Sequence, residues 1–201
     1  MTERKPAFSG AIMILAVVIL LTGHTAAYQT AQTDTLDNPV TAGEVSIELT
    51  EPGYTDRQQV APNSEIIKDP TIINTGTVDA YVYLEVRIPV REVRLAERAQ
   101  ISPPEHLELF SFEPASSWSL IEKEEMENEM RYVFAYSKEI CPGEKTTPLF
   151  EKIRTVSYAE GDVPENQELD VHILARAVQS FSWTDPLQAY QSYFIFARPN
   201  T

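Results

Sequence analysis

Alternating apolar and polar residues dominate the chain after residue 43. The clearest run covers 78–91, where six apolar residues share one face. Successive side chains of a β-strand point to opposite faces, so this run predicts a strand with one buried face. The apolar face carries Ala80, Val82, Leu84, Val86, Ile88 and Val90, and the other face carries Asp79, Tyr81, Tyr83, Glu85, Arg87 and Arg91.

Shorter runs of the same kind predict further strands. They cover 44–50, 65–73, 131–136, 149–156 and 169–177. Asn74-Thr75-Gly76 predicts a tight turn in which Gly76 takes a positive φ. Across this turn we expect 65–73 and 78–91 to pair as a hairpin. Pro89 lies on the outward face near the end of its strand, which indicates an edge or a strand terminus.

Two segments depart from the alternation. Thr184-Asp185-Pro186 predicts a helix start, because a capping oxygen precedes a proline that needs no N–H in the first turn. Segment 92–130 holds Pro103-Pro104 and the acidic run 122–129, and it predicts a long surface insertion with one helical turn. About seven strands and one short C-terminal helix predict an all-β fold, an antiparallel β-sandwich. We place this domain at 42–198.

The first 28 residues predict a secretory signal peptide. Arg4 and Lys5 precede an apolar run over 11–21, and small residues lead to Ala26-Ala27-Tyr28. An eleven-residue helix spans about 16 Å, roughly half of a hydrocarbon core, which favours cleavage over anchoring. We expect a signal peptide at 1–26, cleavage after Ala26 or Ala27, and a flexible arm at 27–41. The protein is then secreted to the cell surface or matrix, and contacts a membrane only through the uncleaved signal peptide.

The charge balance excludes some partners. Loss of residues 1–26 removes one acidic and two basic side chains and leaves 29 acidic and 14 basic ones, a net charge of −15. Such a surface repels phosphate backbones, so we expect no nucleic-acid partner. Cys141 is the one cysteine, and no intramolecular disulfide can form. We expect Cys141 to be a small, buried or semi-exposed apolar residue rather than a reactive thiol. It has no histidine nearby, and Glu139 and Glu144 would raise its pKa.

Five stretches of sequence resemble one known family. They are Thr25-Ala26-Ala27-Tyr28 with Val40-Thr41-Ala42-Gly43-Glu44-Val45, Lys68-Asp69-Pro70, Asn74-Thr75-Gly76-Thr77-Val78-Asp79-Ala80-Tyr81-Val82, Pro142-Gly143-Glu144-Lys145-Thr146 with Leu149-Phe150, and Ala177-Val178-Gln179-Ser180-Phe181. In this order they resemble the TasA/camelysin family of exported Gram-positive proteins. The resemblance implies processing by a SipW-type signal peptidase and a jelly-roll-like sandwich. It further implies assembly into extracellular biofilm-matrix fibres, or, for camelysin-like members, a cell-surface metalloprotease.

The residue types and their spacing give little indication of a catalytic or metal site. A metalloprotease usually places two histidines and a glutamate base on one helix face. Only His106 and His172 remain after signal removal, and no His-Glu-x-x-His occurs, so we expect both to be solvated or locally hydrogen-bonded. Cys141 has no paired base, and no Gly-x-Ser-x-Gly elbow exists. We predict no catalytic residue, no metal site and no cofactor, with the metalloprotease kept as an alternative.

Acidic and aromatic residues allow two further interpretations. The run 122–129 lacks the spacing of a calcium loop, so we expect a solvated charged loop. A second alternative is a module that binds glycan or peptide through aromatic side chains, unless these pack under an insertion or a second sheet. Its candidate residues are Tyr81, Tyr83, Trp118, Phe181 and Trp183.

The N-terminal arm offers a physical route to assembly. Residues Tyr28, Gln29, Thr30, Ala31, Gln32 and Thr33 are uncharged, have moderate β-propensity and cannot supply a core face. Such a segment is either a flexible tail or a strand donated to a neighbour's sheet edge. We favour a non-enzymatic structural protein of the envelope or extracellular matrix that self-associates or binds other matrix proteins. The acceptor edge cannot be named from the sequence.

Overall fold

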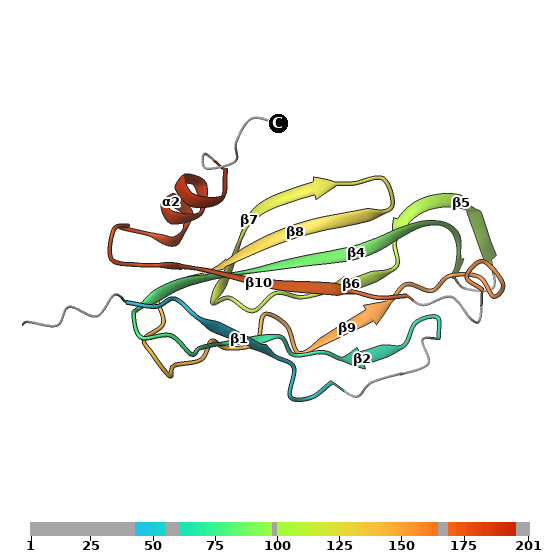
Figure 1. The fold of residues 1–201 in the computed structure, drawn as a ribbon. Helices are drawn as coiled ribbons and strands as arrows, with labels where there is room; N and C mark the ends of the chain where they lie inside the picture. Colours follow the sequence, from blue (N-terminus) through green and yellow to red (C-terminus); the bar gives the residue numbers. More distant parts are fainter. Residues whose placement is uncertain (1–42, 55–60, 98–99, 165–168, 196–201) are drawn as a thin grey trace, which may run out of the picture. The chain divides into compact units, whose positions relative to one another are not determined.

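A computed structural model describes residues 43–54, 61–97, 100–164 and 169–195, which lie within one compact unit of the chain (Figure 1). This part of the chain forms ten β-strands and two short helical segments, and every strand pair is antiparallel. The strands are β1 (Ile47–Thr50), β2 (Glu65–Ile67), β3 (Thr71–Asn74), β4 (Ala80–Glu97), β5 (Gln100–Glu108), β6 (Phe110–Phe112), β7 (Trp118–Glu125), β8 (Glu129–Tyr136), β9 (Lys152–Thr155) and β10 (His172–Gln179). The helical segments are α2 (Pro186–Tyr190) and η1 (Gln191–Ile195). The predicted all-β sandwich with a short C-terminal helix is confirmed.

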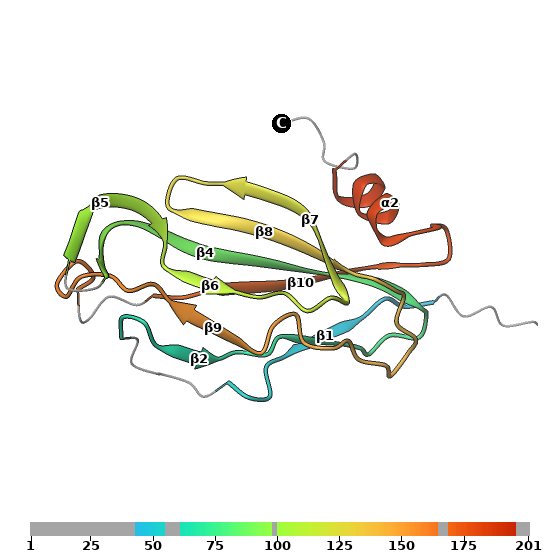
Figure 2. The same cartoon turned by 180° about the vertical axis from the view of Figure 1, so that it is seen from behind.

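The strands form two layers (Figure 2). The main sheet has the order β10-β4-β8-β7, and β5 pairs with the far end of β4. The second layer consists of the pair β1-β3 and the sheet β2-β9-β6. Antiparallel layers of this kind bury alternate side chains between them.

The core confirms the alternation predicted for β4. Val82, Leu84 and Val86 are fully buried and pack in one cluster with residues of the second layer. Ile72 of β3 and Ile153 of β9 belong to the same cluster. The opposite face of β4 points away from this core.

The hairpin predicted between 65–73 and 78–91 is wrong. Residues 65–67 pair with β9, and residues 71–74 pair with β1, so neither strand pairs with β4. Gly76 does not take a positive φ. It is required for another reason, because a Cβ at this position would lie 2.4 Å from the Glu44 carbonyl oxygen and 2.7 Å from the Ser46 nitrogen.

Segment 92–130 also differs from the expectation. Its described residues form no helical turn and instead supply the end of β4, all of β5, β6 and β7, and the start of β8. The acidic run 122–129 is the tip of the hairpin formed by β7 and β8, not a loop. Glu122 and Glu124 form ion pairs with Arg131 on the adjacent strand. Opposite charges on neighbouring strands stabilise the pairing of these strands. The sequence of the run alone does not show that Arg131 lies opposite its glutamates.

Pro89 lies where β4 changes partner. Along one edge, β4 pairs with β10 up to Arg87 and then with β5 from Val90 onward. A proline has no N–H to donate, so the interval between two neighbours tolerates it. The predicted strand terminus at Pro89 is wrong, because β4 continues to Glu97; only the pairing with β10 ends near this position.

The N-terminal predictions lie outside the described residues. These are the signal peptide at 1–26, the cleavage positions Ala26 and Ala27, and the arm at 27–41 with its segment Tyr28–Thr33. Among the described helices, none has the length and apolar character needed to cross a membrane.

Candidate functional site

Most strand edges in the described part of the chain are protected against pairing with another chain. β7 carries a register shift between Leu120 and Glu122 and a run of charged residues, and β5 contains Pro103 and Pro104. β2 and β6 have only three residues each. Bulges, charges, prolines and short length all prevent edge-to-edge association. The two remaining edges belong to β10 and β1.

β10 presents unpaired backbone groups along its outer edge. The Ser180 N–H donates to the Asp79 carbonyl oxygen (3.0 Å), which fixes the alternation along the β10-β4 pair. In an antiparallel pair, every second residue directs its N–H and C=O away from the neighbouring strand. Counting back from Ser180, the outward-directed residues are Gln179, Ala177, Ala175 and Ile173.

The outer edge of β1 has the same character. The N–H groups of Thr75 and Gly76 both donate to the Ser46 carbonyl oxygen (3.0 Å each), so Ser46 faces β3. Ile47 and Leu49 therefore direct their backbone groups outward. In the described chain β1 pairs with β3 alone.

These two edges form what we call the seam, defined by Ile47 and Leu49 of β1 and Ile173, Ala175 and Ala177 of β10. The two strands lie beside each other at the same side of the sandwich (Figures 1 and 2). All five side chains pack against the main core, yet each is only half-buried. The seam therefore exposes core-facing apolar side chains next to unpaired backbone groups, which is the requirement for accepting an added strand.

Glu85 is the centre of a charge cluster on the outer face of the main sheet. Its side chain is 1% exposed. It accepts hydrogen bonds from Arg87 (Nη2–Oε1 2.6 Å) and from Arg176 of β10 (Nη2–Oε2 2.8 Å). Arg131 of β8 adds an ion pair at 3.3 Å between Nε and Oε2.

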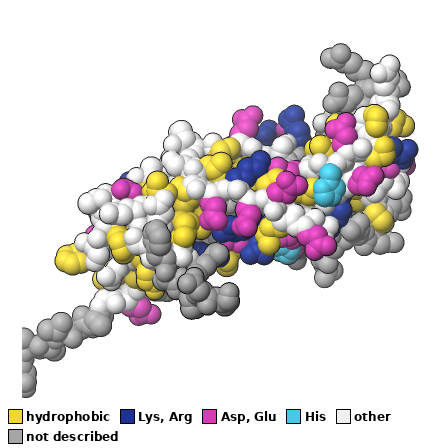
Figure 3. All heavy atoms as spheres, turned by 90° about the horizontal axis from the view of Figure 1, so that it is seen from above, with side chains coloured by type: hydrophobic (Ala, Val, Ile, Leu, Met, Phe, Trp, Pro, Cys, Tyr) yellow, Lys and Arg dark blue, Asp and Glu magenta, His cyan; other side chains and the backbone are white. Residues whose placement is uncertain are grey.

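The cluster is electrically balanced. Arg131 donates to Glu122 and Glu124 at 2.8 Å each, so three arginines face three glutamates. The space-filling view likewise shows basic and acidic side chains interleaved (Figure 3). With both oxygens of Glu85 occupied by guanidinium groups, this carboxylate is not available as a proton acceptor for a substrate.

The pKa shifts of Glu85 and Arg131 favour their charged forms. Burial alone would raise the pKa of the Glu85 carboxyl, but the hydrogen bond from Arg87 and the charges of Arg176 and Arg131 outweigh it. The pKa of Glu85 therefore lies below its ordinary value of 4.5. Hydrogen bonding to Glu122 raises the pKa of the Arg131 guanidinium above its ordinary value. The cluster ties four neighbouring strands together: β10, β4, β8 and β7.

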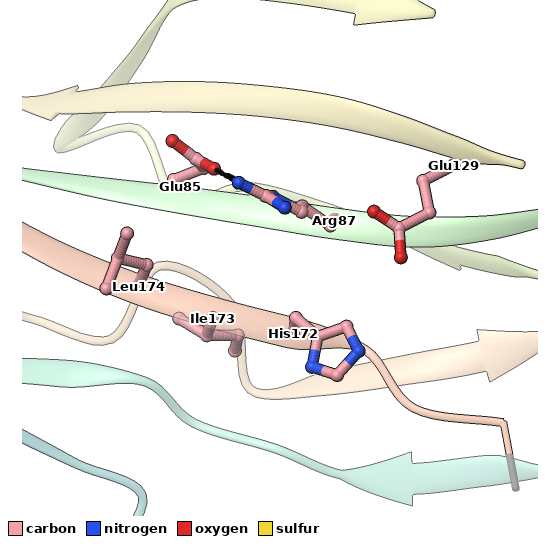
Figure 4. A pocket seen from close by; sticks show the side chains of 6 residues that line it. All are labelled: Glu85, Arg87, Glu129, His172, Ile173 and Leu174. Carbon is pink, nitrogen blue, oxygen red and sulfur yellow. Dashed lines mark hydrogen bonds and ion pairs between the residues drawn. The ribbon is translucent and has the colours of Figure 1, made fainter. Parts of the chain in front are cut away.

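A depression of about 430 Å³ lies next to the cluster. Its lining residues are Glu85, Arg87, Glu129, His172, Ile173 and Leu174. Figure 4 shows Arg87 between Glu85 and Glu129 on the outer face, with His172 on the neighbouring strand. His172 is exposed, and its Nδ1 lies 4.0 Å from Asp170. This depression is open, and four of its six lining residues carry charged or imidazole side chains, so it lacks the enclosed apolar walls of a typical ligand pocket.

The C-terminal helical segments cover one end of the same face (Figure 1). Asp185 caps α2 by accepting a hydrogen bond from the Gln188 N–H (2.8 Å), which confirms the predicted helix start. A second core lies beneath the helix and contains Tyr81, Tyr83 and Tyr190. Burial raises the pKa of Tyr83.

This arrangement corrects the expectation of an aromatic platform. Tyr81 and Tyr83 are buried under the helix, and Trp118 is buried in the main core with its Nε1–H donating to the Thr147 carbonyl oxygen (3.1 Å). Trp183 is half-buried, and only Phe181 is fully exposed. The structure does not bring these five residues together on one surface.

The remaining candidate residues are dispersed. His106 lies exposed on β5, and His172 lies on β10. Among the described residues, no group of three or more His, Cys, Asp or Glu side chains is placed to hold a metal ion. Cys141 is exposed rather than buried, and a hydrogen bond with Asp79, together with nearby carboxylates, raises its pKa in the predicted direction.

We found no family model, curated protein or solved structure that matches this chain. The resemblance to the TasA/camelysin family therefore stays a prediction. The site that the geometry singles out is the seam.

Proposed function

We propose that this chain is an exported structural protein of the cell envelope or extracellular matrix. One copy adds its arm segment Tyr28–Thr33 as a strand to the seam of the next copy. The observation that carries the proposal is the contrast between the seam and the other described edges. The seam combines outward backbone groups and half-buried core side chains with strands of four or more residues that contain no proline, no register shift and no run of charges.

The chemistry of the arm fits this role. An extended segment alternates its side chains, so Tyr28, Thr30 and Gln32 share one face and Gln29, Ala31 and Thr33 share the other. Main-chain hydrogen bonds to the seam supply affinity without requiring charge. An arm that is still attached to the signal peptide stays tethered to the membrane, so signal removal starts the assembly.

The test compares residues 27–201 with a version that begins at Val40, by electron microscopy and light scattering between pH 4 and 8. We expect oligomers or fibres from the first protein and monomers from the second. If both remain monomeric at high concentration, assembly by this protein alone is refuted.

A double proline variant of the seam and a proline control on another edge test the choice of edge. Ala175→Pro, combined with Leu49→Pro, removes outward-directed N–H groups from the seam and should abolish assembly. The control is Lys123→Pro on β7, whose N–H also points away from its neighbour, as the Met126 N–H to Glu129 carbonyl bond (2.8 Å) indicates. Equal loss of assembly in both variants would contradict the choice of edge. Thermal unfolding verifies that each variant is folded.

A further inference from the structure

The outer edge of β10 is long enough to pair with the whole uncharged part of the arm. β10 has eight residues, and four of them direct their backbone groups outward, whereas β1 has four residues and offers two. The arm carries no charge from residue 27 up to its first acidic side chain, Asp34. β10 therefore sets the register of an added strand, and β1 flanks the other edge of that strand.

The core-facing side chains of β10 become smaller toward the end of the strand. Ile173 is followed by Ala175 and Ala177, and all three are half-buried beside the main core. The β4 partners of the two alanines, Leu84 and Val82, are fully buried. An alanine side chain is a single methyl group, so an added strand can place a larger side chain beside the alanines than beside Ile173.

The arm has its one large side chain at the corresponding end. In an extended arm, Tyr28 shares a face with Thr30 and Gln32, and the other face carries no aromatic residue. Close packing favours a large side chain opposite small ones. Tyr28 therefore fits the alanine end of β10, whereas the reverse direction would place it against Ile173.

We propose that the arm pairs antiparallel with β10 in the register that places Tyr28 opposite Ala177. Thr30 then lies opposite Ala175. Every described strand pair is also antiparallel, and this pattern gives a more stable ladder than parallel pairing. The inference rests on the proposed function, because it specifies how the seam receives the arm.

The ends of the arm agree with this register. Ala27 lies opposite Val178, one residue before β10 ends, and Thr33 lies opposite His172, where β10 begins. Asp34 is left outside the paired segment. The uncharged length of the mature arm and the length of β10 thus differ by a single residue, and the pairing begins at the signal cleavage position.

Disulfide formation between two mature chains measures the register directly. In a Cys141→Ser background, one chain carries Gln32→Cys, and the other carries either Ile173→Cys or Ala177→Cys. We expect mixed chains to cross-link through position 173 and not through position 177. Directly opposite residues lie within disulfide reach, whereas a residue four positions further along lies roughly 13 Å away.

The outcomes separate this inference from the proposed function. Cross-linking through position 177 in place of 173 overturns the antiparallel register but leaves the seam as the acceptor. Cross-linking to a chain with Lys123→Cys on β7, with neither seam position reacting, refutes the seam and the register together. Assembled protein that forms no mixed cross-link at any of these positions also overturns the register.

An exchange of side-chain sizes gives a second readout, measured by light scattering. Ala177→Leu fills the room assigned to Tyr28 and should weaken assembly at least tenfold, whereas the matched control Ala177→Ser should assemble like wild type. Adding Tyr28→Ala to Ala177→Leu should restore most of the loss, which an effect on folding alone would not do. Equal losses with and without Tyr28→Ala would overturn the proposed pairing.

Discussion

Replacing Arg131 with methionine tests whether the charge cluster holds the outer face of the main sheet together. The Arg131 side chain is 6% exposed and contacts Glu85, Glu122 and Glu124. Methionine keeps much of the apolar stem but removes the charge and its hydrogen bonds. The variant therefore isolates the ionic contribution of a single buried side chain.

The expected loss in the free energy of unfolding depends on which ion pairs remain after Arg131 is replaced. Removing one member of a buried ion pair typically costs about 3 to 5 kcal/mol, because a buried charge is left uncompensated. Glu85 keeps Arg87 and Arg176, so we expect a loss near the lower limit, about 3 kcal/mol. A domain of ordinary stability, roughly 5 to 15 kcal/mol, survives this loss.

Urea-induced unfolding at pH 7 and pH 3 measures the effect. The pKa of Glu85 lies below its ordinary value, so its stabilisation is complete above that value and is lost as the pH falls through the folded-state pKa. The difference between wild type and Arg131→Met should therefore shrink at pH 3. The control Arg154→Met removes an exposed ion pair with Glu65 and should leave the free energy of unfolding almost unchanged. Equal losses in both variants, or a loss from Arg131→Met that does not depend on pH, would refute the reasoning.

Four further outcomes are expected. Gly76→Ala should destabilise the fold by about 1 to 3 kcal/mol in thermal unfolding, because its Cβ meets backbone atoms. Tyr190→Phe should cost about 1.5 to 3 kcal/mol through the lost hydrogen bond to a carboxylate. Asp185→Ala should cost about 1 kcal/mol and increase amide exchange in α2. Sedimentation should show stronger association at pH 4.5–5 or in high salt than at pH 7.5 in low salt, because the sequence pI is about 4.6.

Local patterns predicted the helix start and most strands outside segment 92–130, whereas β5, β6 and β7 within that segment were missed. The alternation along β4 and the Asp185-Pro186 cap are properties of a few consecutive residues, and the structure confirms both. Strand pairing was not predictable in the same way. Residues 65–73 look like a hairpin arm, but their partners β1 and β9 are chosen by packing between layers.

The outer face illustrates the same limit. Tyr81 and Tyr83 alternate like exposed residues, and only the helix about 100 residues later in the chain covers them. The glutamates of β7 look solvated until Arg131 of the adjacent strand is brought beside them. The seam was unpredictable because an edge is defined by the absence of a neighbour, which no local pattern of residues records.

Amide hydrogen exchange on assembled and monomeric protein tests the central claim most directly. The account predicts fast exchange at Ile47, Leu49, Ile173, Ala175 and Ala177 in the monomer and strong protection of the same amides after assembly. The amides of β7 should not change. Protection that appears on β7 while the seam amides continue to exchange quickly would contradict the account.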